Sequence, residues 1–207
     1  ASQLPYQSHP LSFLPASTWF SESLLPTAFK PAYLGDPKGE TRTNADGVIG
    51  HIRIGAKAKA DLELRPDATQ FSVIESKMHS PLSKGTQHAP NFDQAARNVA
   101  CMAESLKQSN RKPELFTNLG FLVLAPQTEL GKFTHLVNKE SIQAKVSERV
   151  NQYDGRLDTW YQEWFEPTLE KISLQVISWE ATIDWLSQQV PKIHQPLYSF
   201  YQHCLVC

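Results

Sequence analysis

Residues 56–64, AKAKADLEL, alternate strictly between apolar and charged side chains. A period of two is typical of a β-strand with one face in the core and the other in solvent. The next segment, RPDAT (65–69), has the chemistry of a turn because proline fixes φ and aspartate can cap the turn. QFSVIESKM (70–78) then suits a returning strand. With GVIGHIRIG (47–55) before them, these segments predict a three-stranded antiparallel meander over residues 47–78.

The rest of the 207-residue chain predicts one α/β domain around a mixed sheet. We expect an extended arm over residues 1–16, a core over 17–126, and C-terminal helices with one strand over 127–207. The elements expected outside the meander are a helix at 17–29, a loop at 33–47, a helix at 91–108 capped by Asn91, a strand at 119–126, helices at 138–153 and 160–172, a strand at 174–179 and a helix at 180–190.

The charge distribution limits which classes of partner are plausible. The formal net charge is −1, which argues against a surface coated with basic residues. Residues 51–112 nevertheless hold ten Lys and Arg against six acidic residues, whereas residues 113–207 hold seven against eleven. A basic patch in the middle of the chain can therefore still recognise a polyanion.

Membrane and disulfide signals are weak. No run approaches the roughly 18 apolar residues of a membrane-spanning helix, and three cysteines do not suggest a disulfide framework. We expect a cytoplasmic protein with reduced cysteines and no membrane partner.

The strand at 70–78 ends in charged residues that its alternation places on one face, Glu75 and Lys77. If the 65–69 turn closes symmetrically, Asp61 lies opposite Glu75, with Cβ atoms about 5 Å apart. Two carboxylates at that separation repel one another unless a cation lies between them. Hard oxygen ligands favour Mg²⁺, and Mn²⁺ should substitute for it. Lys77 would then lie beside the metal.

Asp61, a hairpin, and then Glu75-Ser76-Lys77 resemble the PD-(D/E)XK nuclease superfamily. The resemblance covers residues 17–126 and implies a restriction-endonuclease-like core, in which a helix, a three-stranded meander, a helix and a strand follow one another. Members often place a glutamine on the helix after the Glu-x-Lys strand, and Gln94 is in that position.

Many members of the superfamily also carry an acidic residue on the N-terminal helix. Glu22 is the matching candidate here, and Glu40 remains open as an alternative. A bare Glu-x-Lys is common on surface strands, so the set of residues in the correct order gives the resemblance its weight.

The resemblance implies metal-assisted hydrolysis of a phosphodiester bond. Asp61, Glu75 and the Ser76 carbonyl would bind Mg²⁺, and Lys77 would act on the attacking water and on the developing negative charge. Gln94 would orient the water or a phosphate. Three basic residues are candidate phosphate contacts: Lys59, Lys84 and Arg97.

The sequence therefore predicts a magnesium-dependent nuclease that acts on DNA rather than RNA. Assembly as a homo-oligomer or with a protein partner is left open. One alternative is a non-catalytic nucleic-acid-binding or scaffolding subunit with the same fold. Another is a metal-dependent phosphodiesterase that acts on small nucleotides.

Overall fold

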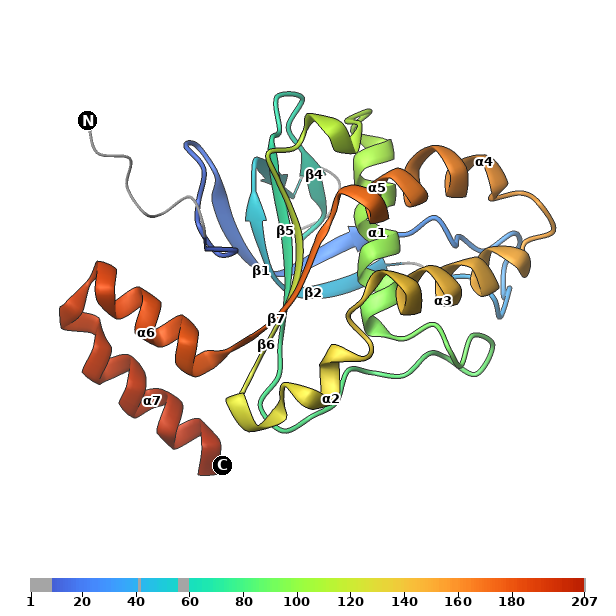
Figure 1. The fold of residues 1–207 in the computed structure, drawn as a ribbon. Helices are drawn as coiled ribbons and strands as arrows, with labels where there is room; N and C mark the ends of the chain where they lie inside the picture. The colour runs from blue at the N-terminus through green and yellow to red at the C-terminus, as the bar shows by residue number, and fades with distance from the viewer. Residues whose placement is uncertain (1–8, 41, 56–59, 207) are drawn as a thin grey trace.

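A five-stranded mixed sheet forms the centre of the protein in the computed structural model, which describes residues 9–40, 42–55 and 60–206 (Figure 1). Its strands lie in the order β1-β2-β5-β6-β7. β1, β2 and β5 pair antiparallel, and β5, β6 and β7 pair parallel. The bounds of these strands are β1 Thr18–Pro26, β2 Arg42–Gly50, β5 Gln70–Ser76, β6 Asn118–Ala125 and β7 Ser173–Ser178.

A short hairpin and a set of helices complete the fold. The hairpin strands pair only with each other within the described residues, so they form a separate two-stranded sheet. None of the described helices is both long and apolar enough to cross a membrane. These elements are β3 Ile52–Ile54, β4 Leu62–Leu64, α1 Gln94–Gln108, η2 Pro113–Leu115, η3 Gln127–Glu129, α2 Gly131–Thr134, α3 Lys139–Asn151, α4 Asp158–Trp160, η4 Tyr161–Phe165, α5 Glu166–Lys171, α6 Trp179–Gln189, η5 Pro191–Ile193 and α7 His194–Val206.

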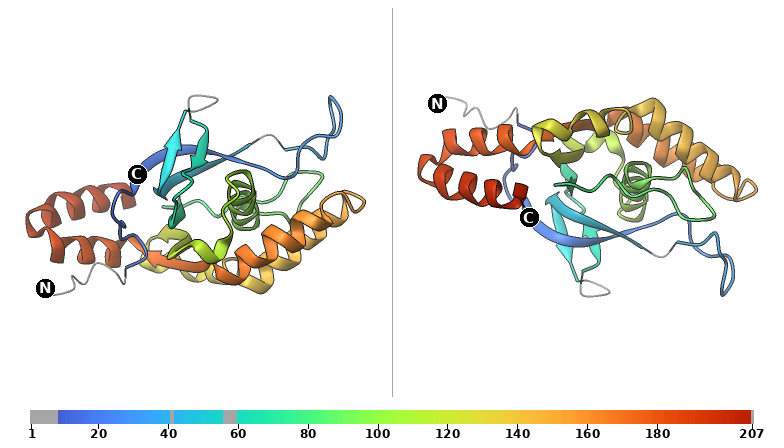
Figure 2. Two further views of the ribbon diagram at one scale, coloured as in Figure 1. Left: turned by 90° about the horizontal axis from the view of Figure 1, so that it is seen from above. Right: turned by 90° about the horizontal axis from the view of Figure 1, so that it is seen from below.

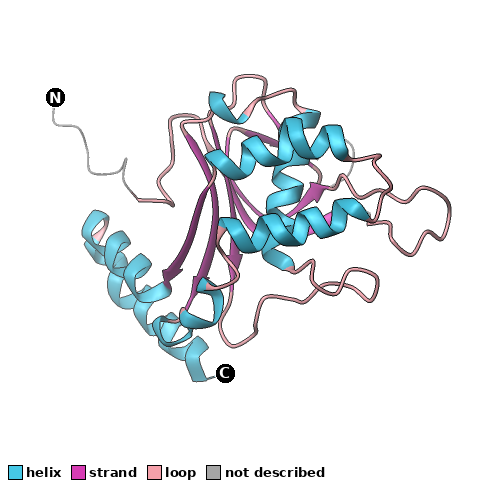
Figure 3. Ribbon diagram, turned by 45° about the vertical axis from the view of Figure 1, so that its right-hand side comes forward, coloured by secondary structure: helices cyan, strands magenta, loops and turns pink. Residues whose placement is uncertain are grey.

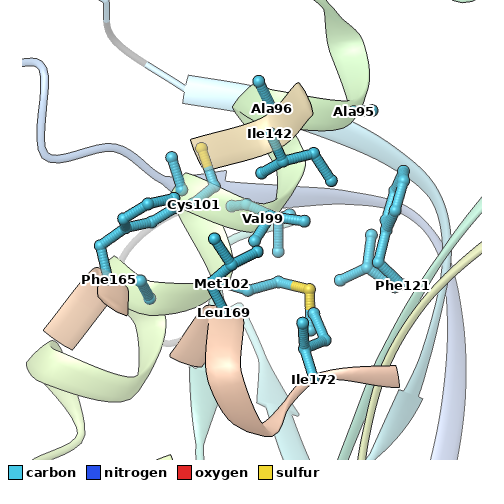
Figure 4. Close-up of a cluster of buried hydrophobic side chains, with 14 of the residues drawn as sticks. Ala95, Ala96, Val99, Cys101, Met102, Phe121, Ile142, Phe165, Leu169 and Ile172 are labelled. Carbon is cyan, nitrogen blue, oxygen red and sulfur yellow. The ribbon is translucent and has the colours of Figure 1, made fainter. Parts of the chain in front are cut away.

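The main hydrophobic core lies between one face of the sheet and helices α1, α3 and α5 (Figures 1 and 4). Val99 and Met102 of α1 pack there with Phe121 of β6 and with Leu169 of α5. β5 and β6 are buried almost throughout, because they are central strands covered on both faces. The predicted strand at 119–126 is therefore confirmed.

A smaller core cluster covers the opposite face of the sheet. It contains Ile49, Ile74, Leu122 and Leu124, with Trp179 of α6 packed against it. Figures 2 and 3 show α6 and α7 as a helical hairpin on the side of the sheet away from α1, α3 and α5. The sheet thus has a thick helical layer on one face and a two-helix layer on the other.

The prediction of a helix at residues 17–29 is wrong, because residues 18–26 form the edge strand β1. Trp19, Phe20, Leu24 and Leu25 do have helical spacing. The segment instead pairs with β2 from Thr18 to Pro26, and hydrogen bonds to a neighbouring strand override a weak local preference.

The expected extent of the meander is also wrong. A loop is expected at 33–47, but strand β2 begins at Arg42 within that range. Residues Gly47–Gly50 of β2 pair with β5. Of the alternating stretch 56–64, only residues 62–64 form a described strand, and residues 56–59 lie outside the described residues. β2 therefore takes the place next to β5 that the sequence suggests for residues 56–64.

The helix expected at 91–108 is present as α1 but begins at Gln94. Its N-cap is Asp93 rather than Asn91, since the Asp93 side chain accepts a 3.0 Å hydrogen bond from the Ala96 amide. Lys145 of α3 forms a 2.6 Å ion pair with the same carboxylate. This cap fixes where the first turn of α1 begins, and so which side chains face β5.

A buried arginine, Arg149, joins α3 to the loop between β1 and β2. It donates hydrogen bonds to the Lys38 carbonyl and to Tyr153 Oη, and its guanidinium lies 3.7 Å from Glu40 Oε1. Neither Glu40 carboxylate oxygen has a hydrogen-bond partner among the described residues. Burial raises the pKa of Glu40, and the charges of Arg97 and Arg149 oppose that rise.

Candidate active site

Glu75 lies fully buried near the end of β5, on the face of the sheet that packs against α1. Phe71 and Val73, four and two positions earlier, are also fully buried and belong to the main core. Strand alternation therefore gives Glu75 the direction of the core residues that precede it, as the sequence predicts.

The Glu75 carboxylate accepts three hydrogen bonds. Lys77 Nζ and Gln94 Nε2 donate to Oε2 at 3.1 and 2.5 Å, and Asn98 Nδ2 donates to Oε1 at 2.8 Å. Gln94 and Asn98 are four residues apart on α1, so both face β5 from successive turns. The predicted association of Glu75, Lys77 and Gln94 is present, and Asn98 adds a donor whose role the sequence analysis did not identify.

A loop residue holds the Gln94 amide in its orientation. The Ser83 amide donates to Gln94 Oε1 at 3.1 Å, which leaves Gln94 Nε2 directed at Glu75. The loop after β5 and the start of α1 are therefore tied to the same carboxylate.

Asp46 of β2 is the second carboxylate at this end of β5. Its Oδ2 accepts a 2.7 Å hydrogen bond from the Ser76 amide and lies 3.8 Å from Lys77 Nζ. The β2–β5 register pairs Gly47 with Ile74, so Asp46 follows at the level of Glu75. The Asp46 side chain is one-third exposed, whereas that of Glu75 is buried. The cluster thus contains two carboxylates and one ammonium at the end of one strand pair.

The surroundings of Glu75 make it a much weaker acid than usual. Burial, and then the charge of Asp46, raise its pKa from 4.5 to about 7, while Lys77 and Asn98 oppose the rise. A carboxyl group with a pKa near 7 can exchange a proton at neutral pH. Such perturbation by burial and a second carboxylate is common at functional sites, although structural ion pairs also produce it.

Two further contacts fix the backbone of Lys77. Its amide donates to the Leu124 carbonyl of β6 at 2.8 Å, and its carbonyl accepts a 3.1 Å hydrogen bond from Trp179 Nε1 of α6. The chain therefore remains anchored to β6 and α6 just beyond the last residue of β5. This anchoring holds the Lys77 side chain over Glu75.

Asp61 does not occupy the position next to β5 that the sequence suggests. It forms a bridge with Leu24 of β1, and the Leu24 amide donates to the Ala60 carbonyl at 2.9 Å. β1 and β2 lie between this backbone and β5 in the strand order. The prediction that Asp61 faces Glu75 across adjacent strands is wrong, because β3 and β4 pair with each other and leave the sheet.

Glu22, the predicted acidic residue from the first element, lies on strand β1 rather than on a helix. It is exposed and has a φ of 53°, in the left-handed region that non-glycine residues rarely adopt. The flanking pairs Ser21–Gly47 and Ser23–Ala45 place Glu22 opposite Asp46 in the register. Glu22 is thus near the site in the strand pairing, whereas Glu40 lies with Arg149 under α1 and α3.

The predicted phosphate contacts fall in different surroundings. Lys84 is exposed in the loop before α1, next to Ser83. Arg97 lies one turn beyond Gln94, and its guanidinium donates to the Phe92 carbonyl at 3.4 Å. Lys59 lies outside the described residues. Of the two that the structure describes, Lys84 is the exposed one and Arg97 is half-buried.

The donor set suits a hard divalent cation only in part. Among the described residues, no group of three or more His, Cys, Asp or Glu side chains could hold a metal ion. Asp46 and Glu75 supply two carboxylates, and Mg²⁺ commonly takes one or two and keeps several waters. Of about four lone-pair positions on the Glu75 carboxylate, three accept hydrogen bonds, which leaves one on Oε1. The residues present therefore offer a hydrated Mg²⁺ two carboxylates, and Lys77 Nζ already lies within 4 Å of both.

No protein-family model, curated protein or solved structure matches the chain. The functional interpretation consequently depends on the arrangement of the residues themselves.

Proposed function

We propose that the protein is a nuclease of the PD-(D/E)XK type, which hydrolyses phosphodiester bonds of DNA with Mg²⁺. The observation that supports it most strongly is the contact of the buried Glu75 carboxylate with Lys77, Gln94 and Asn98 beside Asp46. Three antiparallel strands, then α1, then the parallel strand β6 resemble the meander, helix and strand of the restriction-endonuclease-like core, whereas strand β1 stands where that core begins with a helix. In this proposal Asp46 replaces Asp61 as the acidic partner of Glu75.

Each residue has a role that follows from its surroundings. Asp46 and Glu75 would hold the cation, with the Ser76 carbonyl as the proposed third protein ligand. The cation would supply Lewis-acid stabilisation of the phosphate and lower the pKa of water. Lys77, placed by β6 and α6, would stabilise negative charge on the phosphate oxygens. Gln94 and Asn98 would keep the Glu75 carboxylate in one orientation.

The test measures cleavage of linear, circular and single-stranded DNA and of RNA by the full chain, with Mg²⁺, Mn²⁺ or EDTA. Asp46→Asn keeps an oxygen that can accept from the Ser76 amide but removes the charge. Lys77→Met keeps most of the side-chain volume without the ammonium. Each change should reduce the rate about 100-fold or more. The matched controls, Asp184→Asn and Lys132→Met, alter exposed side chains and should keep the wild-type rate.

Cleavage at equal rates by wild type, Asp46→Asn and Lys77→Met would refute the proposal. DNA binding without cleavage under any condition would favour the non-catalytic subunit, with or without a protein partner. Asp61→Asn tests the strand register: a larger loss from this change than from Asp46→Asn would restore Asp61 as the acidic partner.

A further inference from the structure

A cavity of about 760 Å³ lies on the face of the sheet opposite Glu75, between the strands, the N-terminal arm and α6. Its volume is within the range of about 300–1,000 Å³ that is typical of small-molecule sites. Four aromatic side chains line it: Phe13 of the arm, Trp19 of β1, and Trp179 and Trp185 of α6. Phe13 and Trp19 are each about half exposed, at 52% and 51%, so the aromatic lining is open to solvent.

The cavity borders the candidate active site. Asp46 and Ser76 line it, and these two residues are joined by the 2.7 Å hydrogen bond between the Asp46 carboxylate and the Ser76 amide. Trp179 also lines it and donates its indole hydrogen bond to the Lys77 carbonyl. A molecule with one part in the cavity can therefore place another part beside Asp46 and Lys77.

Trp19 reaches this position because the neighbouring strand has a glycine there. A Cβ on Gly47 would lie 2.3 Å from Trp19 Cη2, so the indole ring rests directly on the β2 backbone. Gly47 follows Asp46 in the chain, which fixes the Trp19 ring next to the candidate metal-binding carboxylate.

The chemistry of the lining indicates a flat, neutral occupant. Among the described residues that line the cavity, Asp46 is the only charged one, so the cavity offers no cation to a phosphate group. Aromatic side chains stack on nucleobases with little sequence preference, because every base has a π-face. The His9 ring of the arm already stacks on the Trp185 ring of α6, with their centroids 3.9 Å apart and 10° between their planes.

We propose that this cavity takes unpaired bases of a nucleic-acid strand whose phosphate lies at Asp46 and Lys77. The inference rests on the proposed function for the class of ligand, and it narrows the substrate to single-stranded regions. Bases within a duplex are already stacked and paired, so they reach such a cavity only if they are unstacked. Phosphates would stay outside the apolar walls, at the rim where the cavity-lining Asp46 lies 3.8 Å from Lys77 Nζ.

The experiment measures binding of fluorescein-labelled oligo(dT) to the full chain in EDTA, by anisotropy and by quenching of tryptophan fluorescence. The comparison ligand is a strand of equal length in which abasic sites replace the thymidines, so that the phosphates remain and the bases are absent. Oligo(dT) should bind at least tenfold more tightly than the abasic strand, because the abasic strand has no bases to stack on the aromatic side chains. A duplex of the same length should quench tryptophan fluorescence less.

Trp19→Ala should weaken oligo(dT) binding about tenfold and leave binding of the abasic strand unchanged. Phe13→Ala is the second variant, and both side chains are half exposed, so both variants should fold. Tyr33→Ala is the matched control, since this exposed aromatic residue does not line the cavity. Equal affinity of the wild type for oligo(dT) and the abasic strand would overturn the inference, as would oligo(dT) binding that both Trp19→Ala and Phe13→Ala leave unchanged.

The two proposals can fail separately in this design. Cleavage that depends on Asp46 and Lys77, together with base-independent binding, would refute the cavity assignment alone. Base-dependent binding through Trp19 without cleavage by the wild type would refute the nuclease and keep the cavity assignment.

Discussion

Replacing Glu75 by glutamine should change how the stability of the protein depends on pH. In the native protein the pKa of Glu75 rises from 4.5 to about 7, so the native state binds the proton more tightly than the unfolded chain does. The stabilising contribution of this proton is fully present below pH 4.5 and is lost as the pH rises to about 7. At about 1.36 kcal/mol per pH unit, the loss is about 3 kcal/mol. A glutamine at position 75 does not ionise, so the free energy of unfolding of Glu75→Gln lacks this pH-dependent contribution.

The assay is urea unfolding of wild type and Glu75→Gln at several pH values between 4.5 and 8. The difference between their free energies of unfolding should change by about 3 kcal/mol in favour of the variant as the pH rises. A constant offset from altered hydrogen bonds does not affect this change, and other titrating groups, including Glu40, largely cancel. Glu114→Gln, at an exposed position, should follow the wild-type profile. A difference that stays constant within about 0.5 kcal/mol across this range would show that the Glu75 pKa is not raised.

Two further predictions concern stability. Arg149→Met should destabilise the protein by about 3–5 kcal/mol, because it leaves the Glu40 carboxylate buried without its nearest cation. Adding Glu40→Gln should recover part of that loss in chemical denaturation, and full additivity of the two changes would contradict the pairing. Gly50→Ala should cost about 1–3 kcal/mol, since its Cβ would lie 2.4 Å from the Gln70 carbonyl oxygen. Gly131→Ala has nothing within 4 Å of its Cβ and should be neutral or slightly stabilising; equal melting temperatures for these two glycine variants would contradict the close approach of β2 and β5.

The sequence was sufficient to predict the parts of the site that depend on local periodicity. The alternation of β5 directs Glu75 toward the core, whereas Gln94 was expected beside it from the resemblance to the PD-(D/E)XK superfamily. Their contact could be predicted because a helix that follows a central strand packs back on the sheet. The hydrogen bond between Gln94 and Glu75 therefore combines a local pattern in β5 with an expectation that the resemblance supplied.

The partner strand of β5 could not be predicted in the same way. Residues 56–64 have the stronger strand pattern, whereas RTNADGVIG of β2 contains several residues that are uncommon in strands. Strand pairing depends on contacts between residues far apart in the sequence. β2 lies next to β5 because it forms hydrogen bonds with β1 on one edge and with β5 on the other. Asp46 was missed for this reason. The available signal was its position directly before Gly47–Gly50, the start of a segment already expected to be a strand of the meander.

The hydrogen bond from Trp179 to the Lys77 carbonyl joins residues that are 102 positions apart in the chain. During synthesis from the N-terminus, β5 and α1 emerge from the ribosome before α6. The Lys77 carbonyl can therefore accept the Trp179 hydrogen bond only after α6 has been synthesised. The complete site therefore requires the chain to extend through α6. A chain shortened before residue 179 would expose Ile74, Leu122 and Leu124 to water and would leave the end of β5 without this anchor.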